Sequence, residues 1–363
     1  APVRSPRPCR CAGVSGVGTI YLRSILAIYE SMLKKVAQFI AQSNRIKSVI
    51  YPVADYALRL ISRRKAKNYD LRKTRLIVCP GRSGSTWLAE LSAQTPGYAI
   101  IWEPLHPGNN PTCRNHGFGW QNYLLANTHA PQEKEYLHRI LSGKEVSVRT
   151  LTSLELDLPN LASKNGGFVV KMVQGNMILP FVIEHFPVKV VFMARHPCAV
   201  VASQVRHGSW KHITKKNITI PEKIFKKYPH VKSTFLRVKE SEELLAFEWA
   251  IQNLVPLSHP EPHPWFFTTY EWIVDKGVQE VEKIYQYFGS SLPSKIKDKV
   301  TQPSQTASRQ FSKKSRLLGW KKELSNKKIS NILSVVHDIG VHIYDDQEMP
   351  NVDMCPTSAR GSL

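Results

Sequence analysis

The chain has 363 residues, of which 42% are hydrophobic, so it can fold around a large core. It carries 50 Lys and Arg against 28 acidic residues, and the net charge of +22 favours a nucleotide, an acidic polysaccharide, a membrane surface or nucleic acid as partner. Zinc-finger spacing, an RNP-like aromatic motif and a basic region leading into heptads are all missing, which argues against nucleic acid. The six cysteines lack C-x-x-C spacing, so neither a structural zinc site nor a dense disulfide framework is indicated.

We expect residues 1–74 to form a basic extension of the main domain. Its first part, 1–12, is rich in Pro and Arg and is predicted to be disordered, whereas 17–66 has helical spacing. Residues 17–41 have the pattern of a basic amphipathic helix, which would lie on a membrane surface or, equally, pack on the protein's own core. The apolar stretch 13–29 has an arginine at its centre and falls short of the about 20 nearly uncharged residues that a membrane span needs.

From Arg75 onward, short β-rich apolar runs alternate with stretches of helical spacing, which predicts a parallel sheet with crossover helices. We expect one catalytic domain over 75–345 and a C-terminal tail over 346–363. The expected strands are 75–79, 99–103, 168–172, 188–194 and 264–270, and the expected helices are 85–95, 175–186, 197–207 and 276–288. Two irregular insertions, 104–167 and 205–240, would either bind the acceptor or be structural excursions.

The loop at 80–86 joins the first expected strand directly to the first expected helix. Such a strand, tight loop and helix start point backbone N–H groups at one spot, where the helix dipole also favours negative charge. The loop offers two glycines, three hydroxyls and one fixed positive charge: Gly81, Gly84, Ser83, Ser85, Thr86 and Arg82. No Lys follows the second glycine, unlike the G-x-x-x-x-G-K-[ST] loop of nucleoside triphosphatases. We therefore predict a phosphate site of another kind.

The run GRSGSTWL, which begins at Gly81, resembles the 5′-phosphosulfate loop of PAPS-dependent sulfotransferases. Its Arg82 stands where cytosolic enzymes carry Lys, so it is most similar to the carbohydrate sulfotransferase branch. The resemblance implies that Arg82 through Trp87 hold the 5′-phosphosulfate and that Arg82 stabilises the charge growing on the leaving phosphate. It also implies an α/β, P-loop-like three-layer fold with a central parallel sheet of about five strands and flanking helices.

A second motif follows the expected strand 188–194. Arg195-His196-Pro197 opens a helix, with Pro197 suited to its first position, and Ser203 lies about 12 Å further along the axis at 1.5 Å per residue. An arginine at a strand end is alone more often a surface residue. The spacing is similar to the family's 3′-phosphate motif R-[DH]-P-x-A-[VL]-x-x-S, and this implies that Arg195 and Ser203 bind the 3′-phosphate. His196 stands where Asp is common and leaves both ligands intact.

Transfer to a hydroxyl requires a general base. Glu103 ends the second expected strand, at the sheet edge where ligands of parallel sheets gather. The run WEPLHP around it also resembles the F-E-P-L element of carbohydrate sulfotransferases. We predict Glu103 as the base, with His106 as the second choice. Lys171, at the end of the third strand, would place a positive charge near the sulfuryl group or be an ordinary surface lysine.

Two looser resemblances lie in the C-terminal half. Tyr270 in TTYEWI resembles a Y-E-D-[LM] element whose Tyr lies near adenine, although Trp272 replaces the usual Asp. Residues 308–325 resemble the family's late basic loop. The basic residues that would close over the 3′-phosphate there, if they are not simply solvated, are Arg309, Lys313, Lys314 and Arg316.

The sequence thus predicts a sulfotransferase that uses PAPS, releases PAP and needs no metal ion. It acts on a hydroxyl acceptor, which the resemblance implies is a carbohydrate. Two other functions remain open. A P-loop nucleotide kinase or triphosphatase would turn over ATP or GTP with Mg²⁺, and an inactive basic polyanion-binding protein would retain heparin without transfer. The location also stays open between a Golgi or other secretory membrane and the cytoplasm of a bacterium.

Overall fold

The computed structural model describes residues 44–151, 157–210, 212–304 and 312–357. The chain divides into two units, Ala1–Asp55 and Tyr56–Leu363. The described part of the first unit is the beginning of helix α2 (Asn44–Ala66), which continues into the second. The expectations for 1–12 and for 17–41 lie outside the described residues. No helix that the structure describes is long and apolar enough to cross a membrane.

The second unit is built on a sheet of five strands in the order β2-β3-β1-β4-β5, and every pairing in it is parallel. This confirms the predicted α/β fold with a central parallel sheet, and each strand lies inside its expected run. The strands are β1 (Arg75–Val78), β2 (Ala99–Trp102), β3 (Phe168–Met172), β4 (Lys189–Ala194) and β5 (Phe266–Thr269).

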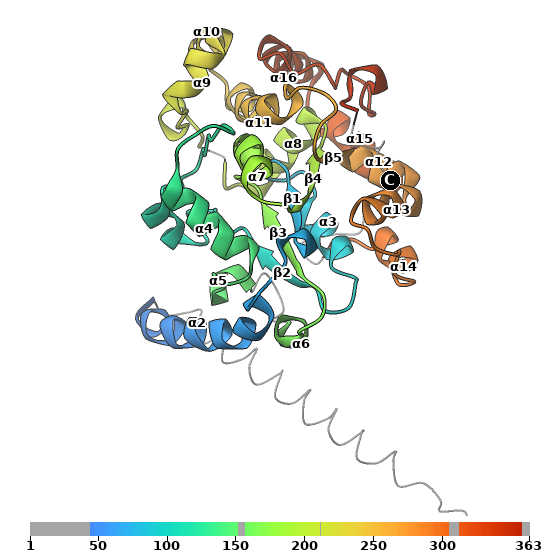
Figure 1. The fold of residues 1–363 in the computed structure, drawn as a ribbon. Helices are drawn as coiled ribbons and strands as arrows, with labels where there is room; N and C mark the ends of the chain where they lie inside the picture. Colours follow the sequence, from blue (N-terminus) through green and yellow to red (C-terminus); the bar gives the residue numbers. More distant parts are fainter. Residues whose placement is uncertain (1–43, 152–156, 211, 305–311, 358–363) are drawn as a thin grey trace, which may run out of the picture. The chain divides into compact units, whose positions relative to one another are not determined.

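Both faces of the sheet are buried, which explains why its strands are apolar runs rather than alternating patterns. On β1, Leu76 and Val78 belong to one hydrophobic core, whereas Ile77 belongs to another on the opposite face. The first core includes residues of helices α4 (Pro131–Leu141), α7 (Leu179–His185), α8 (Pro197–His207) and α11 (Ser241–Leu257). The second includes residues of α3 (Ser85–Ser92), α13 (Val278–Tyr287) and α14 (Ile296–Thr301) (Figure 1). The result is the expected three-layer arrangement of helices, sheet and helices.

The helices between and after the strands fall close to their expected positions. The helix expected over 276–288 is divided at Gly277, where φ is 56°. In chain order, α3 (Ser85–Ser92) follows β1, α7 (Leu179–His185) follows β3 and α8 (Pro197–His207) follows β4. After β5 come α12 (Tyr270–Lys276), α13 (Val278–Tyr287), α14 (Ile296–Thr301), α15 (Lys313–Glu323) and α16 (Asn326–Asp338).

The two insertions contain short helices. The first carries α4 (Pro131–Leu141), α5 (Val148–Leu151) and α6 (Leu158–Ala162), and the second carries α9 (Glu222–Lys227) and α10 (Pro229–Arg237). The patterns above do not predict the long helix α11 (Ser241–Leu257), which packs against α8 and α16. Most of its side chains are buried, so it lacks the polar face on which recognition of an amphipathic helix depends.

Candidate functional site

The loop between β1 and α3 takes a backbone shape that its glycines permit. Gly84, which caps α3, has a φ of 94°, and Arg82 has a φ of 69°. A Cβ on Gly84 would lie 2.6 Å from Cδ2 of Tyr270. Glycine is therefore required there by both conformation and contact. The first N–H groups of α3 have no partner within the helix, and Gly84, Ser85 and Thr86 face a cavity.

Gly84→Ala is expected to lower the free energy of unfolding by about 3 kcal/mol, because a left-handed non-glycine residue and overpacking add their costs. The Tyr270 ring has little room to retreat, since it lies 5.8 Å from the Trp87 ring and 4.1 Å from the Arg195 guanidinium. Urea unfolding measures the effect. Gly81→Ala is the matched control, because a Cβ there meets no atom within 4 Å. Equal stability of the two variants would contradict this reading of the loop.

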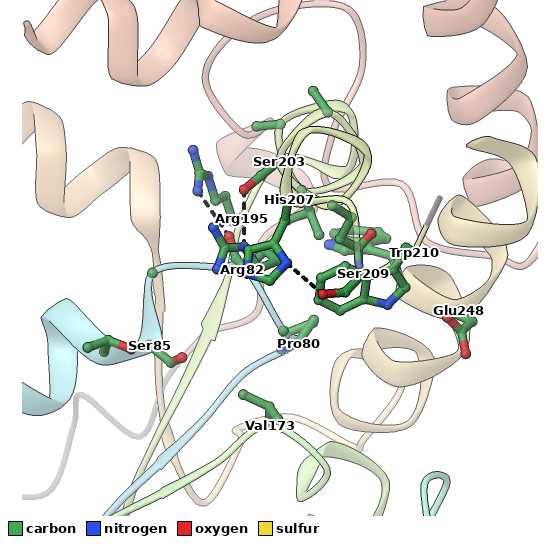
Figure 2. Close-up of a pocket in the computed structure, with 18 of the residues that line it drawn as sticks. Pro80, Arg82, Ser85, Val173, Arg195, Ser203, His207, Ser209, Trp210 and Glu248 are labelled. Carbon is green, nitrogen blue, oxygen red and sulfur yellow. Dashed lines mark hydrogen bonds between the residues drawn. The ribbon is translucent and has the colours of Figure 1, made fainter. Parts of the chain in front are cut away.

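The structure brings the two sequence motifs together. Arg82 Nε donates to Ser203 Oγ at 3.2 Å, and an Arg195 terminal nitrogen donates to the Arg82 carbonyl oxygen at 3.0 Å (Figure 2). Parallel pairing of β1 with β4 sets their carboxyl ends side by side, so both motifs open at one edge of the sheet. Ser203 is only 6% exposed and its α8 neighbours pack into the core, which fixes its position.

Two of the arginines at this edge, Arg82 and Arg195, carry charge that no carboxylate of the described residues pairs with. Burial, together with Arg195 and Arg206, lowers the pKa of Arg82. Arg206 pairs with Glu323, but among the described residues neither Arg82 nor Arg195 forms an ion pair with a carboxylate. The Nε of Arg195 is buried and has no hydrogen-bond partner there. Such a cluster is suited to an anion with several oxygens.

The remaining loop residues differ in where they point. Ser85, Thr86 and Trp87 line the cavity. Ser83, in contrast, is fully buried, its hydroxyl has no partner among the described residues, and it is not part of the cavity wall. Trp87 stands between the Tyr270 ring and Arg316, whose guanidinium carbon lies 5.2 Å above the indole.

Glu103 directly follows β2, in the same cavity, and is 8% exposed. The Lys171 ammonium donates to Glu103 Oε1, and the Val173 N–H donates to Oε2 at 3.0 Å. Each carboxylate oxygen has a second acceptor position, so the group retains the capacity to receive a proton. Glu103 has a φ of 44°, and non-glycine residues held in such a conformation cluster at functional sites.

Lys171 is therefore a buried partner of the carboxylate rather than a surface lysine, with only 6% of its area exposed. His106 also lies in the cavity, but its Nδ1 accepts the backbone N–H groups of Gly108 at 3.2 Å and Asn109 at 3.1 Å. Burial lowers the pKa of His106 and favours the neutral ring. In that form Nε2 carries the proton and Nδ1 already accepts two N–H groups, so neither ring nitrogen is free to act as a base.

These groups line one cavity of about 1020 Å³. Figure 2 shows Arg82, Arg195 and Ser203 near the end of the loop, while Glu248 on α11 lies apart from them. The wall contains three acidic side chains, Glu103, Glu248 and Glu323, of which the sequence analysis singled out only the first. It also missed Arg206, one helical turn beyond Ser203, although the spacing of three residues on α8 was a usable signal.

The residues singled out in the C-terminal half differ in whether they line the cavity. Tyr270 and Arg316 line the cavity. Lys313 instead pairs with Asp275 at 2.9 Å, and Lys314 is exposed and outside the cavity wall. Arg309 lies outside the described residues. Trp272 is 6% exposed and packs against Phe267 with ring centroids 5.9 Å apart, so it belongs to the core.

His196 has a structural role beside the site. Its Nδ1 accepts the Cys198 N–H at 3.2 Å and caps α8, while Nε2 is 2.9 Å from the Asp345 carbonyl oxygen. Its backbone N–H donates to the buried carboxylate of Glu271 at 3.0 Å, and that carboxylate also accepts the Tyr344 hydroxyl. The residue after Arg195 is thus anchored from three directions.

Acidification is expected to destabilise the protein through His196. Burial lowers the pKa of this ring to about 4, from 6.5, so below pH 6.5 the unfolded chain binds a proton that the folded chain refuses. The contribution of the neutral His196 ring to the free energy of unfolding is fully present above pH 6.5. About 3 kcal/mol of it is lost as the pH falls to 4. Urea unfolding between pH 7 and pH 4.5 measures it. His196→Asn keeps a capping oxygen, and its stability should fall less steeply over this range. Parallel curves for the two proteins would contradict the assignment.

No family model matches the chain, and no curated protein sequence matches it. The chain is similar to several solved structures. One is the sulfotransferase domain from the curacin biosynthetic pathway, at 17% identity and a TM-score of 0.38, over 76% of this chain and 98% of that one. Another is the sulfotransferase domain of the Synechococcus PCC 7002 olefin synthase, at 15% identity and a TM-score of 0.39, over 75% of this chain and 94% of that one. A third is retinol dehydratase in complex with androsterone and inactive cofactor PAP, at 13% identity and a TM-score of 0.37, over 78% of this chain and 83% of that one.

Proposed function

We propose that this chain is a sulfotransferase that moves the sulfuryl group of PAPS to a hydroxyl acceptor on a carbohydrate. One observation carries the proposal: the Arg82 loop and the Arg195–Ser203 helix, 113 residues apart in sequence, meet through direct hydrogen bonds in a cavity that also contains Glu103. The donor carries phosphate at two positions of its ribose, and two adjoining cationic groups without carboxylate partners match that pattern.

In this proposal the 5′-phosphosulfate lies against the N-terminus of α3, held by Arg82, Ser85 and Thr86. Arg195 and Ser203 bind the 3′-phosphate, with Arg316 available beside Trp87. Tyr270, which touches both Trp87 and Arg195, is in a position to contact the adenosine. The proposed catalytic domain is 75–345, and the bond from Tyr344 to Glu271 supports its C-terminal limit. We give Ser83 a role in shaping the loop, since it is buried.

The reaction balances without a further reactant. The acceptor oxygen forms a bond to sulfur while the bond from sulfur to the 5′-phosphate oxygen breaks. The hydroxyl proton passes to Glu103, and PAP leaves with one more negative charge on its 5′-phosphate, which Arg82 stabilises. Lys171 holds one carboxylate oxygen of Glu103 in place during this step. A sulfuryl group carries a single charge, so electrostatic stabilisation by arginines replaces the Mg²⁺ of a triphosphate site.

The two alternatives make different demands on the site. A kinase or triphosphatase requires the lysine after the second glycine, where Ser85 stands. An inactive polyanion-binding protein has no use for a buried Glu103 and Lys171 pair, since burying two charges is costly. We therefore favour transfer over both.

Incubation of the protein with ³⁵S-labelled PAPS and a panel of glycans, phenols and alcohols tests the function. We expect label on glycans without added divalent metal. Turnover of ATP or GTP with Mg²⁺ would favour the kinase, and heparin retention with no labelled product would favour the binding protein. Either result would overturn the proposal.

A further inference from the structure

Helix α11 carries a carboxylate that the proposed reaction does not use. Its surroundings are apolar, because Leu244, Leu245, Phe247 and Ile251 are all buried in the core. Among these buried positions, Glu248 and, one turn later, Gln252 are only partly buried, and both line the cavity. A carboxylate on an otherwise buried helix costs stability unless it is used, so Glu248 is a candidate for ligand binding.

Direct contacts connect this carboxylate to the proposed catalytic base. The His106 N–H donates to the Glu103 carbonyl oxygen at 3.0 Å, and the His106 ring lies edge-on to the Trp120 ring at 4.8 Å. Next in sequence, Gln121 directs its amide nitrogen at Glu248 Oε1 from 3.4 Å. All five residues line the same cavity. Side chains in contact with one another thus line the wall from Glu103 to Glu248.

The two ends of the cavity differ in charge. The described Lys and Arg residues of the wall are Arg82, Arg195, Arg206 and Arg316, which belong to the donor motifs or adjoin them, and Lys171, which is paired with Glu103. Around Glu248 the wall presents Gln121, which bonds to it, Trp120, next in sequence, and Gln252, one turn later on α11. Figure 2 shows Trp210, which follows α8, on the side of Glu248. Aromatic faces and amides suit an uncharged, hydroxyl-rich ring, whereas a carboxylate repels an anion.

We propose that Glu248, with Gln121 and Trp120, forms an acceptor subsite in which the carboxyl group hydrogen bonds to an uncharged sugar and excludes anionic acceptors. This inference rests on the proposed function and specifies its acceptor. The net charge of the chain suggests an acidic polysaccharide instead, so the subsite reverses the expectation from composition.

Two further observations support the subsite. Burial raises the pKa of Glu248 to about 7, against a smaller opposing effect of the Gln121 hydrogen bond. Near pH 7 the group is therefore divided between two forms: the protonated form can donate to a hydroxyl, and the ionised form accepts from a hydroxyl and repels an anion. In addition, Gln174 Oε1 is buried and has no hydrogen-bond partner among the described residues, although Gln174 lines the cavity. A hydroxyl donor would satisfy it.

Glu248→Gln tests the subsite through the ratio of labelled anionic product to labelled neutral product. Wild-type protein and the variant are each incubated with ³⁵S-labelled PAPS and an array of glycans that pairs neutral oligosaccharides with carboxylated or sulfated ones. We expect the wild type to label neutral glycans, and the variant to raise the ratio of anionic to neutral product by about tenfold or more, because it loses a charged hydrogen-bonding group. Affinity for PAP should stay within twofold, and KM for the neutral acceptor should rise more than kcat falls.

Glu242→Gln is the matched control, since Glu242 lies on the same helix, pairs with Lys328 and is not part of the cavity wall. It should leave the product ratio unchanged. Preference of the wild type for anionic glycans, or an unchanged ratio in Glu248→Gln, would overturn the subsite while leaving the proposed function intact. Tight PAP binding with no labelled glycan would overturn both the subsite and the transfer step, and absence of PAP binding would overturn the donor site itself.

Discussion

Glu103→Gln should reduce sulfuryl transfer by about 10²- to 10⁴-fold and leave PAP affinity within twofold, because the amide cannot accept the hydroxyl proton. Glutamine keeps an oxygen for the buried Lys171 ammonium, which donates to Glu103 in the wild type. Alanine would leave that ammonium without its partner, at a cost of about 3–5 kcal/mol, and would confuse catalysis with stability.

Initial rates with ³⁵S-labelled PAPS measure the effect on transfer, and calorimetric titration with PAP measures the effect on nucleotide affinity. Glu222→Gln is a suitable control, since its side chain is 80% exposed on α9 and pairs only with Lys226 among the described ion pairs. Thermal denaturation of both variants shows that they are folded. Transfer by Glu103→Gln at the wild-type rate would refute the assignment of the base. His106 would not replace it, because its Nδ1 already accepts two backbone N–H groups.

Arg82→Ala is expected to weaken PAP binding by about 30-fold or more, since removal of one partner of a desolvated charge pair costs about 2–5 kcal/mol. The effect includes loss of the bond from Arg82 to Ser203, which holds the two halves of the site together. Ser203→Ala removes a single neutral hydroxyl and should weaken binding by about tenfold or less.

The control for Arg82→Ala is Arg237→Ala, which removes a cation that pairs with Asp338 on the surface and is not part of the cavity wall. It lowers the net charge by the same amount and should leave PAP affinity unchanged. Isothermal titration at constant ionic strength measures all three variants, because long-range attraction depends on salt. PAP binding that survives both Arg82→Ala and Ser203→Ala would exclude the proposed donor site.

Sequence alone predicted the sheet and its carboxyl edge well, because buried parallel strands leave short apolar runs that are easy to recognise. The prediction that Arg82 and Arg195 share one site rested on the resemblance of their motifs to those of sulfotransferases. The structure does bring the two residues together, because each follows a strand and adjacent parallel strands end at the same edge. The prediction that Ser203 belongs with them rested on the same resemblance. The strands and the start of α8 at Pro197 depend on local chain geometry, which sequence patterns record directly.

Other features depend on contacts between distant segments and left no local signal. The pairing of Glu103 with Lys171 depends on the β2–β3 register, in which Trp102 lies opposite Lys171 and the Glu103 N–H donates to the Lys171 carbonyl oxygen at 2.8 Å. The positive φ of Glu103 likewise had no signal in the sequence. Glu248 lies on a helix whose apolar pattern hides its period, so neither the helix nor its carboxylate was predicted. Among the C-terminal basic residues, only packing of Arg316 over Trp87 distinguishes it from Lys313 and Lys314.

The claim that the Arg82 loop and the Arg195–Ser203 helix form one site is tested most directly by titrating the wild-type protein with PAP and with AMP. The two nucleotides share the 5′-phosphate and differ only in the 3′-phosphate. If Arg195 and Ser203 bind that group, PAP should bind about tenfold or more tightly than AMP, as loss of charge-assisted hydrogen bonds would predict. Equal affinity for PAP and AMP would contradict the account.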